Sequence, residues 1–489
     1  MSRHTRPSRR DFLKTSVAAS AVFSTFTIAG TKASGRVLGA NEVVRVAVAG
    51  INGRGGSHIE AYAGDKNGTQ VTYLVDPDSR LFESRTRDVN KRGGNKPTCV
   101  QDFRRALDDK NVDVLTIAAP NHWHAPLTIF ACEADKDVYV EKPASHNIHE
   151  GRIAVDMARK HNRIVQHGTQ GRSGSTGSYA AALAESGKVG KLLVSRGLCY
   201  KRRDRGNGLV PSVDKVATPD KLDFNLWLGP ASDRPYHKGL VHYTWHWFWD
   251  FGNGDIGNQG VHEIDKARWG IPGATLPTSV ISLGGRFGPK DHGETANTQV
   301  SVFDYGDTQL IFEVRAMESD EYYGQGVGNV YHYEEGVLAG NKFYPNGSKE
   351  STSLEFKPEL KRGPGGDHFG NFIAAVRSRK TEDLNADILE GHYSAALCHL
   401  ANVSYRLGQD VPYDSQAKTF GDNKAAVESI ERMNEHLKDN GLKLDQLTYR
   451  VGRMLKFDPP AEKFVDDSEA NSLLTRNYRA PFVVPEKVV

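Results

Sequence analysis

The fold is decided by the stretch Val43 to Gly56, which reads VVRVAVAGINGRGG. Val43 to Ala49 is apolar and β-branched, as a buried strand is, and a glycine-rich turn follows it directly. Glycines between a strand and a helix let backbone N–H groups approach a pyrophosphate, whose charge the helix N-terminus favours. The stretch therefore predicts the first strand and turn of a dinucleotide-binding fold.

The spacing of this turn departs from the usual fingerprint at one position. Gly50 and Gly55 occupy the outer glycine positions, but Asn52 stands where the middle glycine is usual. Asparagine tolerates left-handed backbone and adds bulk, and we expect Gly53 and Gly56 to restore the room that a pyrophosphate needs.

Asp76 strengthens the prediction. It lies 76 − 55 = 21 residues after the last fingerprint glycine, at the end of the second predicted strand. An acid there accepts hydrogen bonds from the adenosine ribose, and its charge repels a 2′-phosphate, so NAD is favoured over NADP. The alternative is that Asp76 only caps the next helix.

Strands and helices alternate beyond the turn, which predicts an α/β fold with a parallel first sheet closing near Gly168. The expected strands of that sheet are 43–49, 71–75, 112–118, 138–140 and 164–166, and the expected helices are 79–91, 126–134 and 151–160. Later strands follow one another without helices between them, which favours an antiparallel second sheet from 192–200, 279–283, 299–305 and 309–314. Helical spacing returns near 369–376 and 397–407, and a last helix is expected from about 422 to 437.

Length and composition agree with several domains in a globular chain. The 489 residues correspond to about three domains on a soft prior of one per ~150 residues. The chain is 38% hydrophobic and 25% charged, and it has no apolar run of membrane-spanning length. This composition excludes an integral membrane protein. The four cysteines lack any CxxC spacing, so a zinc knuckle or a dense disulfide framework is not indicated and free thiols are expected.

The positive charge is concentrated at the amino terminus. Residues 1–40 hold seven Lys and Arg against Asp11, a local net charge of +6, and the remainder is 56 − 59 = −3. A nucleic-acid partner is therefore not supported. The run Ser8 to Lys14, SRRDFLK, with the weakly apolar stretch 17–29, resembles a twin-arginine export signal that is too short to anchor stably. The alternative is a disordered basic terminus.

Three further motifs, AAPNHWH at 118–124, EKP at 141–143 and GNQGVHEID at 257–265, resemble those of the Gfo/Idh/MocA oxidoreductase family. The resemblance covers the chain from about Asn41 to Gln409. It implies an N-terminal Rossmann domain and a C-terminal α/β domain with an open, largely antiparallel sheet whose face forms the substrate site. It also implies hydride transfer between a nicotinamide and a sugar or cyclitol, and a homo-oligomer formed through the open sheet face.

These expectations divide the chain into four parts. They are a twin-arginine signal and linker at 1–40, an NAD-binding Rossmann domain at 41–168, a substrate-binding α/β domain with C-terminal helices at 169–415, and a C-terminal extension at 416–489.

The resemblance assigns Lys142 to the lysine near the nicotinamide and the substrate hydroxyl. Desolvation beside a cationic nicotinamide would lower its pKa and let it take the hydroxyl proton; the alternative is a surface lysine paired with Glu141. Glu141 resembles a residue near the nicotinamide ribose. The cofactor-binding residues predicted are Gly50, Asn52, Gly53, Arg54, Gly55, Asp76, Pro120, Asn121, His124, Glu141 and Lys142.

The family's second pattern, Asp-x-Gly-x-His-x-x-Asp, is altered here. Asn258 replaces the leading aspartate and His262 is retained. Because asparagine cannot accept a proton, the acid–base role moves to His262 or Lys142, and Asn258 orients a sugar hydroxyl. Asp255, three residues earlier, is a further candidate to compensate. A metal held by His262 and its neighbours is disfavoured, because hydride transfer needs none.

Aromatic residues precede this pattern in the run YTWHWFWD at 243–250, which contains three of the six tryptophans. Flat aromatic faces such as Trp245 stack on sugar rings, although an aromatic core or a subunit interface is an equal alternative. Gln170 and Arg172 are placed by the family pattern to reach substrate, or they are plain loop residues.

Two function classes remain in view. The first is an exported, periplasmic NAD-dependent oxidoreductase acting on a sugar, sugar derivative or cyclitol, with a tightly held and internally recycled cofactor. The alternative is a glycoside hydrolase or lyase that oxidises a ring hydroxyl transiently with bound NAD. A cofactor-binding protein without catalysis is a third reading, for which only the asparagine at position 258 argues.

Overall fold

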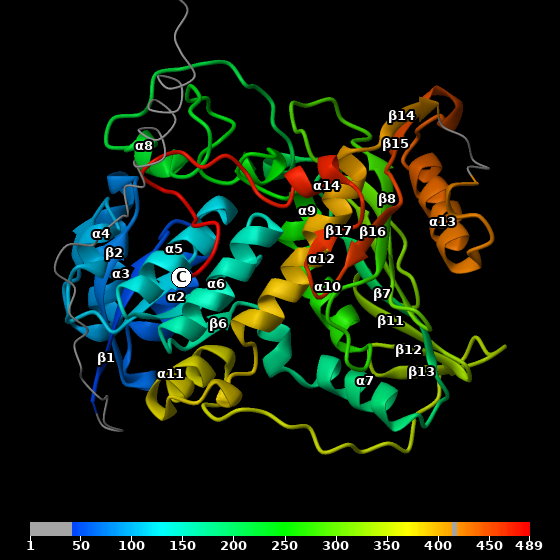
Figure 1. Cartoon of the computed structure of the whole chain (residues 1–489), viewed down its shortest axis with the longest axis horizontal. Helices are drawn as coiled ribbons and strands as arrows, with labels where there is room; N and C mark the ends of the chain where they lie inside the picture. The colour runs from blue at the N-terminus through cyan, green and yellow to red at the C-terminus, as the bar shows by residue number, and fades with distance from the viewer. Residues whose placement is uncertain (1–41, 413–417) are drawn as a thin grey trace, which may run out of the picture.

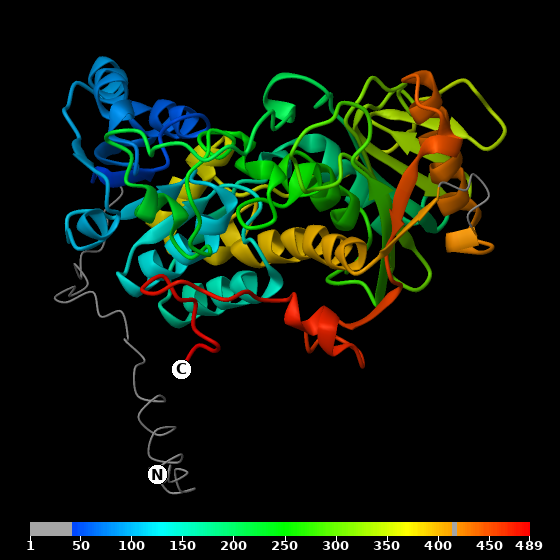
Figure 2. The ribbon, with the colours of Figure 1, turned by 90° about the horizontal axis from the view of Figure 1, so that it is seen from above.

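The structure is a computed structural model that describes residues 42–412 and 418–489, and the predicted export signal lies outside the described residues. Two sheets stand side by side, one near each end of the long axis, with helix α12 (Ile388–Arg406) running between them (Figures 1 and 2). This arrangement places the carboxyl ends of the first sheet's strands against segments of the second part of the chain.

The first sheet is six-stranded and parallel, with order β3-β2-β1-β4-β5-β6. This is the strand order of a dinucleotide-binding Rossmann domain, and it confirms the predicted fold class. Its strands are β1 (Val44–Ala49), β2 (Thr69–Val75), β3 (Thr98–Val100), β4 (Val114–Ile117), β5 (Asp137–Val140) and β6 (Val165–His167).

Helices cover both faces of the first sheet, as its two-sided burial requires. Helices α5 (His124–Glu133) and α6 (Ile148–Lys160) pack with Ala47 and Ala49 of β1 on one face of the sheet. Helix α2 (Gly55–Tyr62) packs with Val46 and Val48 of β1 on the other face. Three further helices of this region are α3 (Phe82–Gly93), α4 (Arg104–Leu107) and α11 (His368–Ser378), and α11 packs against the first sheet although it lies about 200 residues later in the chain.

The second sheet is largely antiparallel, with order β13-β12-β11-β7-β10-β9-β8-β15-β14 and β16 paired to β8. One pair, β7 with β10, is parallel. Its strands are β7 (Leu192–Tyr200), β8 (Ser279–Gly285), β9 (Thr298–Asp304), β10 (Gln309–Arg315), β11 (Val327–Tyr333), β12 (Gly336–Ala339), β13 (Lys342–Pro345), β14 (Gln409–Pro412), β15 (Thr448–Val451), β16 (Leu455–Asp458) and β17 (Lys463–Phe464).

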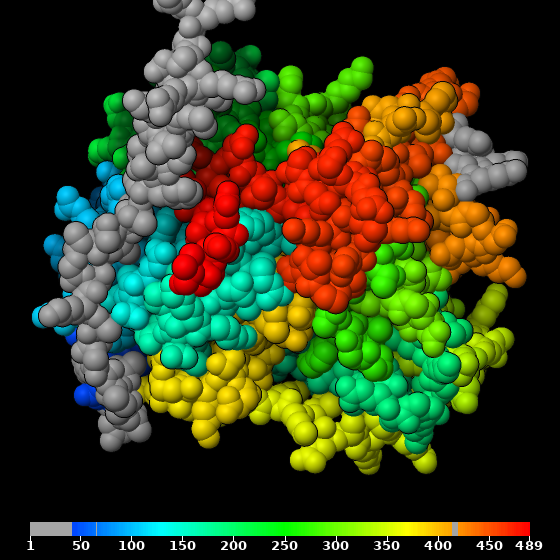
Figure 3. All heavy atoms as spheres, viewed as in Figure 1, coloured from blue at the N-terminus to red at the C-terminus, as the bar shows by residue number. Residues whose placement is uncertain are grey.

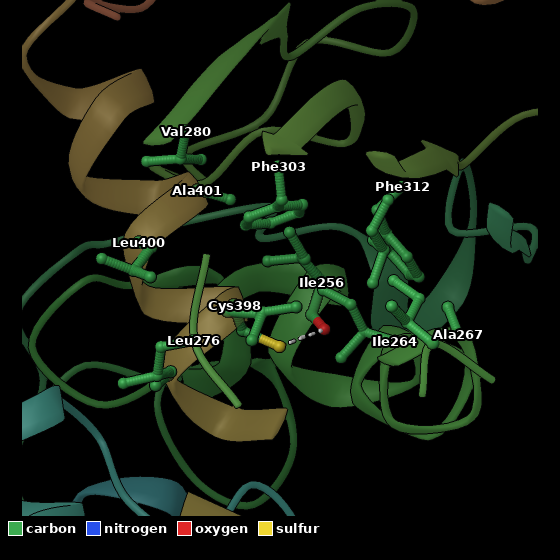
Figure 4. Packing of buried hydrophobic residues seen from close by; sticks show 14 of the residues in the cluster. Ile256, Ile264, Ala267, Leu276, Val280, Phe303, Phe312, Cys398, Leu400 and Ala401 are labelled. Atoms are coloured by element: carbon green, nitrogen blue, oxygen red, sulfur yellow. Dashed lines mark hydrogen bonds between the residues drawn. The ribbon is translucent and has the colours of Figure 1, made fainter. Parts of the chain in front are cut away.

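The strands alternate their side chains between two helix layers. Leu310, Phe312 and Val314 of β10 pack toward α10 (Gly260–Trp269) and α12 in the core drawn in Figure 4, whereas Ile311 packs toward α13 (Lys424–Asp439) on the other face. The remaining helices are α7 (Ser175–Ser186), α8 (Phe224–Leu228), α9 (Gly254–Asn258) and α14 (Ser468–Ser472).

The sequence analysis did not predict β3 or the run of strands β11 to β13. β3 is three residues long, too short to show a period. In β11, Gly328, Asn329 and His332 interrupt the apolar pattern, and Asn329 is buried because its amide donates to the carbonyl oxygens of Arg196 and Glu263. Buried polar groups satisfied by the backbone hide a strand from a hydrophobicity pattern.

Four cysteines, Cys99, Cys132, Cys199 and Cys398, are free thiols. Within the described ranges no helix is long and apolar enough to cross a membrane, and no cluster of three or more His, Cys, Asp or Glu residues could hold a metal ion.

The end of the chain ties the two parts together. We call residues 468–489 the strap; it is drawn in red over the first-domain helices in Figure 3. Leu474 packs in the core of the second part, and Phe482 packs in the core of the first, with its ring centroid 5.1 Å from that of Trp123. Arg479 donates to the carbonyl oxygens of Gly229 at 3.0 Å and Ala231 at 3.2 Å.

Phe482 is 1% exposed, so we expect Phe482→Ala to leave a cavity and lower the free energy of unfolding by about 3 kcal/mol. The neighbouring Val483 is 47% exposed, and Val483→Ala should change stability by less than about 0.5 kcal/mol. Urea unfolding followed by tryptophan fluorescence measures both, because Trp123 contacts Phe482. Equal midpoints for the two variants would show that the strap does not stabilise the fold.

Candidate functional site

A cleft of about 290 Å³ lies at the carboxyl ends of β1, β2, β4 and β5, where dinucleotide-binding folds take their ligand. Segment 242–258 of the second part forms its opposite wall. The predicted residues that line the cleft are Gly50, Asn52, Gly53, Arg54, Asp76, Pro120, Asn121, His124, Glu141, Lys142, Trp245 and Asn258. Gly55, Gln170, Arg172 and His262 stand outside this lining.

Glycine is required at two positions of the turn after β1. Gly50 has a φ of +79°, and a Cβ on it would lie 2.5 Å from the backbone nitrogen of Ala119. A Cβ on Gly55 would lie 2.0 Å from the carbonyl oxygen of Gly50. Asn52 is not among the residues with positive φ, so the left-handed tolerance of asparagine is not used here.

The start of α2 is open to an anion. The helix has no side-chain cap and no acid in its first turn, and a Cβ on Gly53 would meet no atom within 4 Å. Uncapped N–H groups at a helix N-terminus bind phosphate well. The residues present therefore fit the pyrophosphate of a dinucleotide.

Asp76 lies at the base of the same turn. Its carboxylate accepts hydrogen bonds from the backbone N–H groups of Ile51 and Asp78, both at 2.9 Å, and its side chain also lines the cleft. Burial raises the pKa of Asp76 to about 6, against the lowering effect of these two bonds. Asp76 therefore holds the turn, and carboxylate lone pairs remain for a ribose hydroxyl.

Glu141 is a buried carboxylate on which several segments converge. Oε1 accepts from Nε of Arg54 at 2.8 Å, from Nε2 of Gln170 at 3.1 Å, and lies 3.4 Å from Nε2 of His58. Burial alone would raise the pKa of Glu141, but the bond from His58 and the charges of Arg54 and Lys142 hold it well below its ordinary value. Glu141 is therefore charged and joins the turn, α2 and the segment after β6.

Lys142, the residue after Glu141, extends across the cleft. Its Nζ donates to the backbone carbonyl oxygen of Asn258 at 2.7 Å and approaches Oδ1 of Asn258 at 3.4 Å. Burial lowers the pKa of Lys142, aided by the charges of Arg54 and Lys201 and opposed by Glu141. A lysine that deprotonates more easily than in water can take a proton from a hydroxyl.

The asparagine at position 258 is held in one orientation. Its Nδ2 donates to the hydroxyl oxygen of Tyr243 and to Oδ1 of Asp255, both at 3.3 Å, which leaves its carbonyl oxygen toward Lys142. Asp255 is 1% exposed and pairs with Nη2 of Arg203 at 3.0 Å. Asp255 thus lies behind Asn258, where it orients that amide and does not itself line the cleft.

His262, on α10, is half-buried. Burial and the charge of Lys142 lower the pKa of His262 to about 3. An imidazole that remains neutral at such low pH is a poor proton acceptor, so the geometry favours Lys142 over His262 as the base.

The turn after β4 holds its predicted residues by backbone contacts. The ring nitrogens of His124 lie 2.6 Å from the carbonyl oxygen of Pro143 and 2.8 Å from that of Ala119. Burial lowers the pKa of His124, so the neutral ring donates to one of the two. Asn121 donates to Oδ1 of Asn253 at 3.3 Å. Trp245 stacks on His246 with ring centroids 3.6 Å apart, and both rings line the cleft opposite the turn.

Two predicted substrate residues are used inside the protein. Gln170 donates to Glu141 and to the hydroxyl oxygen of Tyr139. Arg172 is buried, and its guanidinium pairs with Asp265 and Glu390, each at 3.0 Å. The structure brings neither side chain to the cleft.

The sequence analysis gave no role to Arg203 and none to Tyr243 individually, although both position Asn258. Arg203 belongs to the basic run KRRDR at 201–205, which resembles an exposed loop in sequence. The pairing with Asp255 spans 52 residues, so no local pattern reveals it.

Comparison with known proteins matches two family models. Residues 44–169 match "Oxidoreductase family, NAD-binding Rossmann fold", and residues 191–441 match "Oxidoreductase family, C-terminal alpha/beta domain". Together they include the cleft and both sheets' central strands.

Two curated relatives and one solved structure are similar to this chain. A levoglucosan dehydrogenase of Pseudarthrobacter phenanthrenivorans is 32% identical over 37% of this chain and 38% of its own length. A glycosyl hydrolase family 109 protein of Shewanella pealeana is 27% identical over 27% of this chain and 30% of its own length, so these matches span well under half of the relatives. The WlbA dehydrogenase of Bordetella pertussis, solved with NADH and UDP-GlcNAcA, is 17% identical with a TM-score of 0.54 over 75% of this chain and 97% of that one, a likeness of fold.

The parallel sheet and the glycine turn before the uncapped helix α2 agree with the two matched regions. The chain therefore belongs to the Gfo/Idh/MocA oxidoreductase family, with an NAD-binding Rossmann domain followed by the family's C-terminal α/β domain.

Proposed function

We propose that this protein is an NAD-dependent oxidoreductase that transfers a hydride between a bound nicotinamide and a CH–OH group of a sugar, sugar derivative or cyclitol. The observation that carries the proposal is Lys142, a half-buried lysine whose pKa is lowered, which lies in the dinucleotide cleft and donates to Asn258 on the opposite wall. Such a group is what alcohol oxidation requires from the protein.

When bound, NAD supplies the hydride acceptor of the oxidation. Lys142 takes the proton from the substrate hydroxyl, which becomes the carbonyl. Oδ1 of Asn258 accepts from Lys142, and its other lone pair accepts from a neighbouring hydroxyl of the substrate. Asp255 and Arg203 fix that amide, and Trp245 offers an apolar face to the ring.

The substrate class is supported by the relatives. The levoglucosan dehydrogenase and an inositol 2-dehydrogenase of Corynebacterium glutamicum, 28% identical over 32% of this chain, bear the names of a sugar derivative and a cyclitol. The aromatic wall and the polar groups around Lys142 suit a hydroxylated ring better than an apolar substrate.

We further propose that the chain is exported by the twin-arginine translocase and works in the periplasm with a resident cofactor. SRRDFLK at 8–14 supports the route, which carries folded proteins. Because little NAD is free outside the cytoplasm, the cofactor would be loaded before export and recycled within the cycle.

A homo-oligomer is part of the proposal. α13 covers β9 and β10 on one face of the second sheet. Val327 at the start of β11 is 44% exposed and Tyr323 in the preceding turn is 36% exposed, and a second copy would pack against this end of the sheet.

The alternative activity is an NAD-dependent glycoside hydrolase or lyase. The family 109 glycosyl hydrolases among the relatives favour it. In that case transient oxidation of a ring hydroxyl acidifies the adjacent C–H, and elimination releases a leaving group without net reduction. Net NADH formation with a free sugar supports the first activity, and release of an aglycone at constant NAD supports the second.

Lys142→Ala should lower turnover at least about 100-fold while leaving NAD binding nearly unchanged, because the amine acts on the substrate proton. The rate of the wild-type enzyme should rise with pH as Lys142 loses its proton, at a pH below the ordinary pKa of lysine. The variant should not show this rise. Nicotinamide absorbance with a panel of pyranoses and cyclitols measures turnover, and calorimetry measures NAD binding. The exposed Lys91→Ala is the control; full activity of Lys142→Ala would refute the assignment.

Asp76→Asn keeps an acceptor for the turn but removes the charge. We expect NAD to bind about tenfold more weakly and the preference over NADP to shrink, because the amide neither accepts as strongly from ribose nor repels a 2′-phosphate. Wild-type affinity should also fall as pH drops through about 6, where Asp76 takes a proton. Calorimetric titrations with both nucleotides test this, with the exposed Asp108→Asn as control; an unchanged NADP preference would contradict it.

Arg9→Lys with Arg10→Lys should keep the chain in the cytoplasm, since the translocase reads the paired arginines and not their charge. Arg3→Lys with Arg6→Lys should be exported normally. Cell fractionation locates the protein, and mass spectrometry of nucleotide released from the periplasmic form should find roughly one NAD per chain. Export of the Arg9/Arg10 variant would contradict the proposed twin-arginine route to the periplasm.

A further inference from the structure

A second cavity, of about 480 Å³, lies outside the cofactor cleft and shares no lining residue with it. It is walled by the loop after the Glu-Lys-Pro motif, by residues 249–253, by the end of α12 and by residues 472–477 of the strap. We call it the strap pocket. The strap lies beyond both matched family regions, so this wall is an addition to the family's two domains.

Arg406, the last residue of α12, brings one positive charge to the strap pocket. Its guanidinium lies over the ring of Trp249, 5.2 Å from the centroid. No hydrogen bond or ion pair links it to another residue of ranges 42–412 and 418–489. Partial desolvation lowers the pKa of Arg406 and the nearby carboxylates of Asp250 and Glu294 raise it, yet an arginine stays charged at every pH of interest. The side chain is exposed, and its guanidinium N–H groups, which make no hydrogen bond to the described residues, are available to an anion.

Arg476, from the strap, brings the second charge. Its Nη1 donates to the carbonyl oxygen of Asp250 at 2.9 Å and to Nδ1 of His146 at 3.3 Å. Because arginine can only donate, Nδ1 of His146 accepts. Burial lowers the pKa of His146 well below its ordinary value, so the neutral ring carries its proton on Nε2.

Two buried N–H groups at the strap pocket are left without partners. Nε2 of His146 and Nε of Arg476 are both buried, and neither bonds to any residue that the structure describes. Native proteins rarely leave buried donors unsatisfied, so such a pair marks a place where acceptor oxygens belong.

Within the described lining of the strap pocket, one carboxylate faces two arginines. Asp250 is the single carboxylate in its described lining, and Oδ2 of Asp250 already pairs with Arg234 at 3.2 Å. Outside the lining, Glu294 accepts from the backbone N–H of Trp249 and attracts the charge of Arg406, and Glu150 attracts the charge of Arg476. Burial raises the pKa of Glu150 to about 7, so at neutral pH it carries only part of a negative charge. The lining therefore combines two arginines with a surplus of donors.

We propose that the strap pocket binds an oxyanion, a carboxylate or a phosphate, between Arg406 and Arg476. Guanidinium groups present planar pairs of donors that match such anions. Asn402 donates to the carbonyl oxygen of Asn253 at 2.9 Å, and no described residue donates to its own Oδ1, which is available to a hydroxyl on the same ligand. Two sources share this chemistry: inorganic phosphate and the carboxylate of an acidic sugar. The site goes beyond the proposed function and does not depend on it.

The test is calorimetric titration of the full-length mature chain with inorganic phosphate, with sodium glucuronate and with glucose. The protein is saturated with NAD so that the glycine turn is filled. We expect one of the two anions to bind with one site per chain, and Arg406→Gln and Arg476→Gln each to weaken it at least about tenfold. Arg87→Gln, an exposed arginine of α3, is the matched control and should leave binding unchanged.

Phosphate binding alone identifies a free phosphate, and glucuronate binding in the absence of glucose binding identifies an acidic sugar; either result supports the site. Absence of binding by both anions overturns it, as does binding that survives both substitutions. If Arg476→Gln fails to fold because it releases the strap from Asp250, Arg406→Gln still decides the matter, since Arg406 has no hydrogen bond to lose. Quenching of Trp249, which should be lost in Trp249→Phe, locates the ligand.

Discussion

The buried carboxylate of Glu141 is the interaction on which the site depends. Glu141 follows β5 directly and contacts Arg54 from the glycine turn, His58 from α2 and Gln170 from beyond β6, so one group fixes three separate segments. A buried charge persists only when it is paired, and the loss of any partner leaves part of that charge uncompensated. The same constraint fixes the position of the next residue, Lys142, relative to the mouth of the cleft.

Asparagine at position 258 is explained by what surrounds it. An aspartate there would lie beside Asp255 and compete with it for Arg203, whereas the amide donates to Asp255 and turns its oxygen to Lys142. Where the family pattern has an aspartate, this chain has an amide, and the carboxylate of Asp255, paired with Arg203, lies three residues earlier. The change moves the charge behind the site and leaves a neutral, oriented acceptor in front of it.

The sequence could predict the first domain and much of its site because the determinants there are local. Gly50, Gly55 and Asp76 act through backbone geometry within one βαβ unit, and the strand boundaries follow an apolar period. The contacts that Gln170 and Arg172 make could not be predicted from the sequence. Arg172, for example, binds Asp265 and Glu390, which are 93 and 218 residues away in the chain. Side chains that satisfy distant buried charges resemble loop residues until the fold brings their partners together.

The strap, which lies beyond both matched family regions, ties the two parts of the chain together at two places. Phe482 packs into the first core and Leu474 into the second, so relative motion of the domains must either carry the strap or break one of these contacts. Domain interfaces within a chain usually allow motion unless they are large and apolar, and the strap adds apolar contact at both ends. Between those ends it closes the pocket of Arg406 and Arg476. An anion bound there would bridge α12 and the strap, and would add a polar contact between the two apolar ends.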